Sequence, residues 1–116
     1  MAKLFSTFVM LKEMLMLLYN TTYQVNIEDA RNFVIWINEY LIPEVEKTGL
    51  MNRPRLLQIL SHKEKDSECF SLQWEVADTA SLHQFYTKHG IALNKEMEKV
   101  FKNKVVGFPT LMEVIR

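Results

Sequence analysis

Cysteine, glycine and proline are scarce in this sequence, and each scarcity excludes a class of protein. The 116 residues contain one cysteine, three glycines and three prolines. A single cysteine cannot form an internal disulfide, which is typical of proteins from a reducing cytoplasm. Three glycines leave little room for a phosphate-binding loop, and no HExxH, CxxC or GxSxG motif occurs. The sequence therefore predicts no metal site and no cofactor.

An excess of charge of one sign is also missing. Fourteen Lys and Arg residues balance fourteen Asp and Glu residues, so no overall field favours nucleic acid or an anionic membrane. Four lysines lie in residues 95–104, but Glu96 and Glu98 are interleaved with them, as is typical of a solvated helix face. We expect neither nucleic acid nor a membrane as a partner.

A signal peptide is suggested by the first residues, where a lysine precedes an apolar run. Lys12 and Glu13 interrupt that run, however, and no small-residue cleavage site follows. The run is also too short and too charged to span a bilayer. We interpret residues 1–14 as an N-terminal extension, helical or disordered, that folding does not need. We expect the protein to be cytoplasmic.

Residues 15–116 are expected to form a single domain, which at this length buries roughly two thirds of its surface. Its clearest strand is SECFSLQWEV, where apolar and polar residues alternate over residues 67–76. Such alternation indicates a strand with one face in a core, and it places Trp74 at the centre of that core. Aromatic, β-branched or alternating residues predict three further strands over residues 15–25, 55–61 and 104–115.

Two helices are predicted between these strands. The first begins at Asn26, which forms a capping box with Asp29, and its apolar residues recur at helical spacing. Pro43 predicts a kink or a short break in it, and Gly49 predicts its C-terminal cap.

The second helix begins at Asp78 or Thr79. It is predicted to run unbroken through Gly90, because the apolar phase continues past that glycine. Its expected core-facing residues are Leu82, Phe85, Tyr86, His89, Leu93, Met97 and Val100.

The order strand, helix, strand, strand, helix, strand predicts an α+β fold. It is the ferredoxin-like βαββαβ arrangement, a four-stranded antiparallel sheet with both helices on one face. The last strand lies at a sheet edge in this topology, and Pro109 within it fits an edge position.

The sheet face without helices is the candidate binding or pairing surface. Its polar residues are Asn20, Thr22, Ser71, Gln73 and Glu75. A solvated antiparallel face is expected to carry more lysine and glutamate than this. We therefore expect a homodimer formed through this face, with any ligand cavity at the same interface.

Other chemically notable residues have a plainer interpretation. Cys69 is flanked by Glu68, and no histidine is fixed beside it by the sequence, so a catalytic thiol lacks support. His83 and His89 point in different directions and cannot form a metal pair. Trp36 and Tyr40 are expected at the edge of the core, and the alternative is an exposed aromatic patch for a partner.

The segments YNTTYQVNIEDARNFVIW, SECFSLQWEV and KVVGFPTLMEV resemble the small bacterial family known as domain of unknown function 4286. The resemblance covers residues 17–115 and implies no activity, since the family has no assigned catalytic residues. The pattern is more loosely similar to dimeric α+β-barrel proteins, some of which are cofactor-free oxygenases or isomerases with a cleft between sheet and helices.

Two functions remain open from the sequence. The favoured one is a non-enzymatic binding or assembly module acting as a homodimer. The alternative is a small cofactor-free enzyme of the dimeric α+β-barrel type. An enzyme needs a titrating group in a pocket, for which Glu75, His89 and Glu113 are the candidates.

Overall fold

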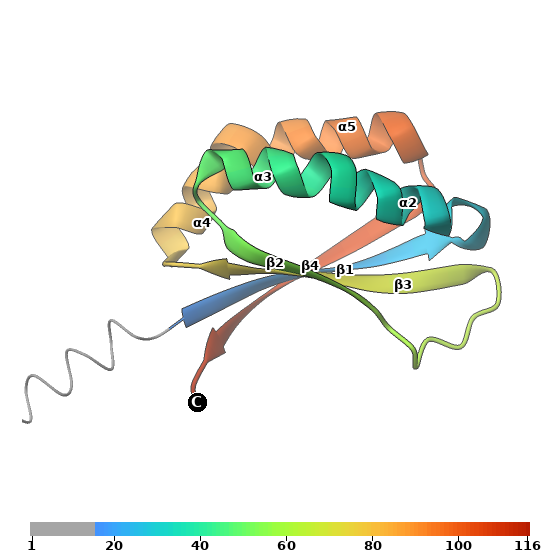
Figure 1. The fold of residues 1–116 in the computed structure, drawn as a ribbon, viewed down its shortest axis with the longest axis horizontal. Helices are drawn as coiled ribbons and strands as arrows, with labels where there is room; N and C mark the ends of the chain where they lie inside the picture. Colours follow the sequence, from blue (N-terminus) through green and yellow to red (C-terminus); the bar gives the residue numbers. More distant parts are fainter. Residues whose placement is uncertain (1–15) are drawn as a thin grey trace, which may run out of the picture.

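A computed structural model describes residues 16–116, which form a four-stranded antiparallel sheet covered by helices (Figure 1). The strands are β1 (Met16–Asn26), β2 (Asn52–Gln58), β3 (Ser67–Val76) and β4 (Val105–Val114). They are arranged in the order β2-β3-β1-β4, with every neighbouring pair antiparallel. The predicted ferredoxin-like fold is therefore confirmed, and β4 is an edge strand as expected. The predicted extension at residues 1–14 lies outside the described residues.

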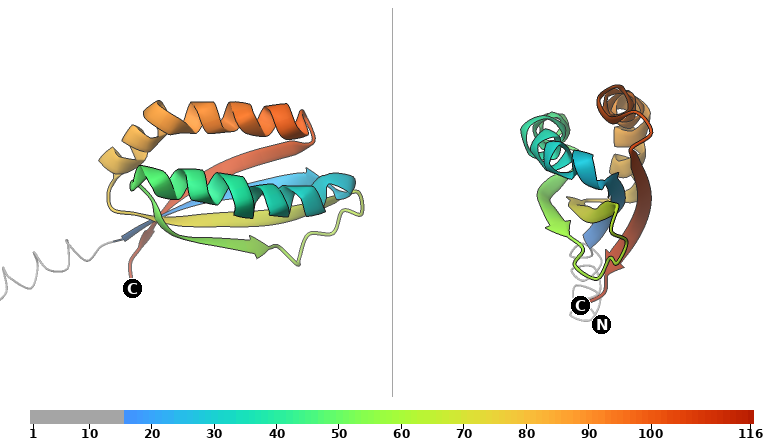
Figure 2. Two further views of the ribbon diagram at one scale, coloured as in Figure 1. Left: turned by 45° about the horizontal axis from the view of Figure 1, so that its top comes forward. Right: turned by 90° about the vertical axis from the view of Figure 1, so that its right-hand side faces the viewer.

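Two helical segments connect the strands. The first contains the 3-10 turn η1 (Ile27–Asp29), the helix α2 (Ala30–Trp36), the π-turn η2 (Ile37–Leu41) and the helix α3 (Ile42–Thr48). The second contains the helix α4 (Thr79–Phe85), the π-turn η3 (Tyr86–Gly90) and the helix α5 (Ile91–Phe101). Both segments lie on the same side of the sheet, and the described helices leave the other side open (Figure 2).

The core lies between these helices and the covered face of the sheet. Phe33 of α2 is fully buried, and its ring centroid lies 5.1 Å from that of Tyr23 and 5.6 Å from that of Phe70. Trp74 is buried at the middle of β3, as the alternation predicted. Trp36 packs edge-on against Phe101, which confirms its place at the margin of the core.

The proline in the first helix is accommodated without a break. Pro43 lies in the first turn of α3, directly after the π-turn η2. A proline removes one backbone donor and clashes with the carbonyl one turn earlier. A π-turn, which gives the backbone room at that point, therefore lies directly before the proline where a kink or a short break was predicted. Gly49 then ends the helix in the left-handed conformation, with φ of 71°, as predicted.

The two predicted N-terminal caps have different outcomes. The capping box at Asn26 is wrong, because the Asn26 side chain makes no capping bond. The Asn26 backbone N–H instead donates to the Lys104 carbonyl at 3.1 Å, so the amide that a capping box would satisfy is already bonded. In the second helix, an Asp78 carboxylate oxygen accepts from the Ser81 backbone N–H at 2.7 Å, which confirms that cap.

The core-facing residues of the second helix differ from the prediction near its C-terminal end. Leu93 and Met97 pack in or against the core as predicted. Val100, predicted to face the core, is 52% exposed, whereas Phe101 is 4% exposed. The helix is continuous through Gly90, as predicted.

Candidate functional site

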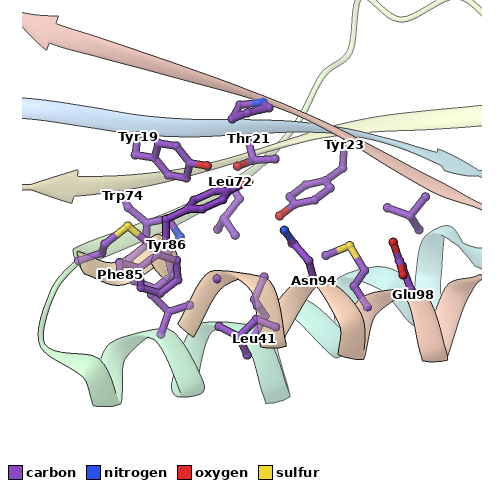
Figure 3. Close-up of a pocket in the computed structure, with 18 of the residues that line it drawn as sticks. Tyr19, Thr21, Tyr23, Leu41, Leu72, Trp74, Phe85, Tyr86, Asn94 and Glu98 are labelled. Atoms are coloured by element: carbon purple, nitrogen blue, oxygen red, sulfur yellow. The ribbon is translucent and has the colours of Figure 1, made fainter. Parts of the chain in front are cut away.

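A cavity of about 270 Å³ lies between the covered face of the sheet and the helices (Figure 3). One part of its wall is apolar, with Leu72 and Trp74 from β3 and Phe85 from α4. Leu41, Val45 and Met51 complete the apolar wall. Its volume is close to the lower end of the roughly 300–1,000 Å³ that is usual for small-molecule sites.

Three of the polar side chains of the cavity come from one strand. Tyr19, Thr21 and Tyr23 alternate along β1, so their three hydroxyl-bearing side chains share the covered face of the sheet. Asn94 and Glu98 lie opposite them, one helical turn apart on α5. In Figure 3 the Tyr23 hydroxyl and the Asn94 side chain point toward one another.

Both tyrosines of this strand hold their protons more tightly than usual. Burial raises the pKa of Tyr23 to about 12, with only partial opposition from the Thr21 hydroxyl. Burial also raises the pKa of Tyr19, against the same hydroxyl. At neutral pH both phenols are therefore uncharged O–H groups, which donate hydrogen bonds and do not act as bases.

A glycine on the edge strand makes room for one of these rings. Gly107 of β4 lies directly opposite Tyr23 of β1. A Cβ atom at position 107 would lie 3.1 Å from Tyr23 Cε1 and 3.3 Å from Thr21 Cγ2, which is tighter than normal van der Waals contact. The absence of a side chain there allows the Tyr23 ring to lie close to β4.

The two π-turns border this same cavity. Leu41 from η2 lines it on one side, and Tyr86 and Gly90 from η3 line it on another. Single π-turns inside helices occur frequently at functional sites. Two turns of this rare type at one cavity mark it as the leading functional site among the described residues.

The residues predicted as a site lie on the opposite face of the sheet, and none of them lines the cavity. Three of them form a hydrogen-bonded group. The Ser71 hydroxyl donates to the Asn20 side-chain oxygen, and the Asn20 amide donates to the Thr22 hydroxyl at 3.1 Å. Gln73 is paired with Asn20 in the sheet register, and Glu75 is paired with Leu18.

This open face also carries apolar side chains near both edges. The sheet register places Leu57 of β2 beside Ser71, and Phe108 of β4 beside Thr22. Phe108 is 55% exposed, and Leu57 is also exposed. The open face is thus a polar centre with apolar flanks.

The groups named for an enzyme do not meet at the cavity. Glu75, His89 and Glu113 are all absent from its lining. Cys69, by contrast, has a histidine beside it, since His62 Nδ1 lies 3.4 Å from its sulfur. His62 lies in the loop between β2 and β3, and sequence spacing cannot predict which way a loop side chain turns.

Tyr19, Thr21 and Tyr23 were predicted only as part of a strand over residues 15–25. Their spacing of two residues places all three on one face of that strand. Three hydroxyls in succession on a core-facing side are unusual, because buried polar groups need partners. That pattern was the available signal for a lined cavity.

Two further classes of site were sought in the described part of the chain. Among residues 16–116, no group of three or more His, Cys, Asp or Glu side chains is arranged to hold a metal ion. None of the helices in that range is long and apolar enough to cross a membrane.

Comparisons with known proteins agree on the fold and leave the activity open. The model of the family described as Domain of unknown function (DUF4286) matches residues 16–115. No curated protein matches the chain.

Several solved structures are similar in fold. A dimeric ferredoxin-like protein from an uncultured marine organism has a TM-score of 0.64 at 13% identity, covering 88% of this chain and 97% of its own. A conserved protein from Methanosarcina mazei Go1 has a TM-score of 0.62 at 19% identity, covering 89% and 94%. A protein from Bacillus cereus named as a candidate antibiotic biosynthesis monooxygenase has a TM-score of 0.56 at 12% identity, covering 87% and 94%. At such identities the likeness shows the fold alone.

Proposed function

This chain belongs to the family described as Domain of unknown function (DUF4286), and we propose that it is a non-enzymatic small-molecule-binding module that acts as a homodimer. The observation that carries the proposal is the cavity of about 270 Å³ with an apolar wall and a row of hydroxyls. A concave, largely apolar site with a few convergent polar groups is the usual form of a ligand pocket.

The chemistry of the wall defines the ligand. Trp74, Phe85 and Tyr86 offer aromatic surface to a flat apolar body. The Tyr19 and Tyr23 phenols, which burial keeps protonated, offer hydrogen bonds to acceptor atoms. The ligand is therefore compact and flat, with carbonyl, ether or hydroxyl oxygens along one edge.

Binding is favoured over catalysis by the protonation of the site. A general base must accept a proton near neutral pH, and the raised pKa values of Tyr19 and Tyr23 oppose this role. Glu98 is the one carboxylate in the lining, and it is exposed. The name of the Bacillus cereus neighbour supports the alternative, a cofactor-free oxygenase that uses this cleft on a substrate with its own reactivity.

A thermal-shift screen of flat oxygen-bearing aromatic compounds tests the binding proposal. A ligand that binds the native state raises the melting temperature by mass action. We expect hits whose shift is strongly reduced by Tyr23→Phe, which removes one donor from the cavity. Tyr40→Phe is the matched control, because Tyr40 lies outside the cavity lining and its variant should keep the full shift.

The fate of each hit separates a binder from an enzyme. Each hit is incubated with the protein in air and recovered for mass analysis. A binding module returns it unchanged, whereas an oxygenase returns an oxidised product whose formation is reduced in Glu98→Gln. A screen without any hit that depends on Tyr23 would contradict both functions.

The homodimer is proposed to form through the open face of the sheet. Its polar centre is already internally bonded through Asn20 and Ser71, and its flanks expose apolar side chains such as Phe108. A two-fold pairing buries the same patch on both chains. The similar protein from a marine organism is named as dimeric. Light scattering at micromolar concentration should give twice the 13.7 kDa of one chain, and a mass of one chain would contradict the pairing.

A cytoplasmic location is proposed, and the free thiol supports it. Cys69 is unpaired, and the chain holds no second cysteine. Because free thiols persist in reducing compartments, we place the protein in the cytoplasm.

A further inference from the structure

A continuous chain of polar contacts leads away from Cys69 on the open side of the sheet. The Cys69 sulfur lies 3.4 Å from His62 Nδ1, and His62 Nε2 lies 2.8 Å from the Ser67 hydroxyl oxygen. The Ser67 hydroxyl donates to a Glu64 carboxylate oxygen at 3.3 Å. Gln24 donates to that same carboxylate oxygen at 3.1 Å and to the Ser67 oxygen at 3.3 Å. These contacts connect the end of β3 with the loop before it and with β1.

The direction of the Ser67 hydrogen bond determines the tautomer of His62. Ser67 has one proton, and that proton is used toward Glu64, so its oxygen can only accept from His62 and Gln24. In the neutral imidazole, Nε2 therefore carries the proton and Nδ1 has a free lone pair. That lone pair faces the Cys69 thiol. Nucleophile, base and orienting group thus lie in sequence, an arrangement that activates nucleophiles.

From this geometry we propose that Cys69 is a covalent modification site at which hydroperoxides oxidise the thiol with His62 as the base. The sulfur attacks one peroxide oxygen and the O–O bond breaks. The thiol proton passes to His62 Nδ1 and then to the departing hydroxide or alkoxide. Cys69 is oxidised to a sulfenic acid, and the peroxide is reduced to water or an alcohol. The site is separate from the cavity, since none of its members lines the cavity.

The surroundings of the thiol explain why a base is needed. Burial raises the pKa of Cys69, and the negative charge of Glu64 raises it further. The thiol therefore stays protonated near neutral pH, and only the thiolate is a strong nucleophile. Because His62 removes the thiol proton during the attack, the sulfur can react although the free thiol is protonated. The same carboxylate has two opposing effects, because it orients His62 through Ser67 while its charge disfavours the thiolate.

The test is the rate at which hydrogen peroxide forms the sulfenic acid, trapped with dimedone and measured by intact mass. Dimedone reacts with sulfenic acid and not with oxidised methionine, and the chain has one cysteine, so every adduct reports Cys69. The protein is used well below micromolar concentration so that pairing does not shield the site. Cys69→Ser should give no adduct.

The variants separate a base from a structural role. His62→Gln should lower the rate at least about tenfold, since general bases contribute about 10²-fold or more. Ser67→Ala should also lower it, whereas Ser67→Thr keeps the hydroxyl and should restore it. Glu64→Gln should raise the rate, because it keeps an acceptor for Ser67 and removes the opposing charge.

Glu68→Gln is the matched control. It neutralises a neighbouring carboxylate that contacts Gln58 at 3.4 Å and takes no part in the chain of contacts, so it should not change the rate. Circular dichroism confirms that each variant is folded. Wild-type reactivity in folded His62→Gln would overturn the proposal, as would a fall in the rate of Glu64→Gln equal to that of His62→Gln.

Discussion

The two faces of the sheet carry similar polar side chains but use them differently. Strand β1 sends Tyr19, Thr21 and Tyr23 to the covered face and Asn20 and Thr22 to the open face. On the open face the polar groups bond to one another, and Asn20 is only 8% exposed although none of the helices within residues 16–116 covers it. On the covered face the hydroxyls border a cavity. Polar groups that hydrogen-bond to one another form a surface that can pack against a second copy of the chain. Polar groups that line a cavity can instead hydrogen-bond to a ligand.

The largest difference between the faces is expected at two neighbouring residues of β3. Trp74 is buried on the covered side, and Glu75 lies on the open side. Trp74→Ala should lower the free energy of unfolding by about 3–5 kcal/mol, because it removes a large buried ring and enlarges the cavity. Glu75→Ala should change it by less than about 0.5 kcal/mol. Urea unfolding measures both, and an unchanged midpoint for Trp74→Ala would contradict the assignment of the faces.

Alkaline pH should weaken the covered face through Tyr23. Its phenol has an ordinary pKa of 10.0, which burial raises to about 12 in the folded protein. Below pH 10 both states are protonated and stability is unaffected. Between about pH 10 and 12 the unfolded chain loses this proton first, so stability should fall by about 1.4 kcal/mol per pH unit.

Urea unfolding at about pH 9 and pH 11 measures this loss. Tyr23→Phe removes the Tyr23 contribution, and only the smaller loss from Tyr19, whose pKa burial also raises, should remain. If the free energy of unfolding falls equally in the wild type and in Tyr23→Phe between these pH values, the Tyr23 phenol is solvated in the folded protein.

The fold was largely predictable from the sequence because its pattern is regular. Alternation in β3 requires one buried face, and it correctly placed Trp74. The two π-turns were not predictable, since they depend on how each helix fits above the sheet. Helical spacing also did not distinguish the exposed Val100 from its buried neighbour Phe101.

The candidate site was less predictable than the fold. Sequence patterns show which side chains face the helices, but they do not show where packing leaves space. The alternation of Tyr19, Thr21 and Tyr23 puts them on one face of their predicted strand, while the cavity beside them depends on Gly107 and on the path of α5. The contact between Cys69 and His62 likewise depends on the conformation of a loop.

The pairing role of the open face is tested at Ser71. Ser71 lies near the middle of that face and donates to Asn20. Ser71→Arg would place an unpaired charge in the interface, so the dissociation constant should rise at least about tenfold. Gln84→Arg adds the same charge on the exposed side of α4 and should leave the dimer intact. Sedimentation measures both variants. If Ser71→Arg leaves the dissociation constant unchanged, the dimer contact lies elsewhere, at the β4 edge or at the core margin around Trp36.

A substitution at Gly107, which should change stability only slightly, separates the two roles of the covered face. Gly107→Ala reduces the freedom of the unfolded chain, which stabilises by about 0.4–1 kcal/mol. The added methyl group also meets Tyr23 Cε1 at 3.1 Å, which offsets that gain by displacing the ring. The net change in unfolding free energy should therefore stay within about 1 kcal/mol, while the displaced Tyr23 hydroxyl weakens ligand binding. Thr110→Ala, on the open face of the same strand, should keep full binding. Equal thermal shifts with both variants would show that the position of Tyr23 does not determine affinity.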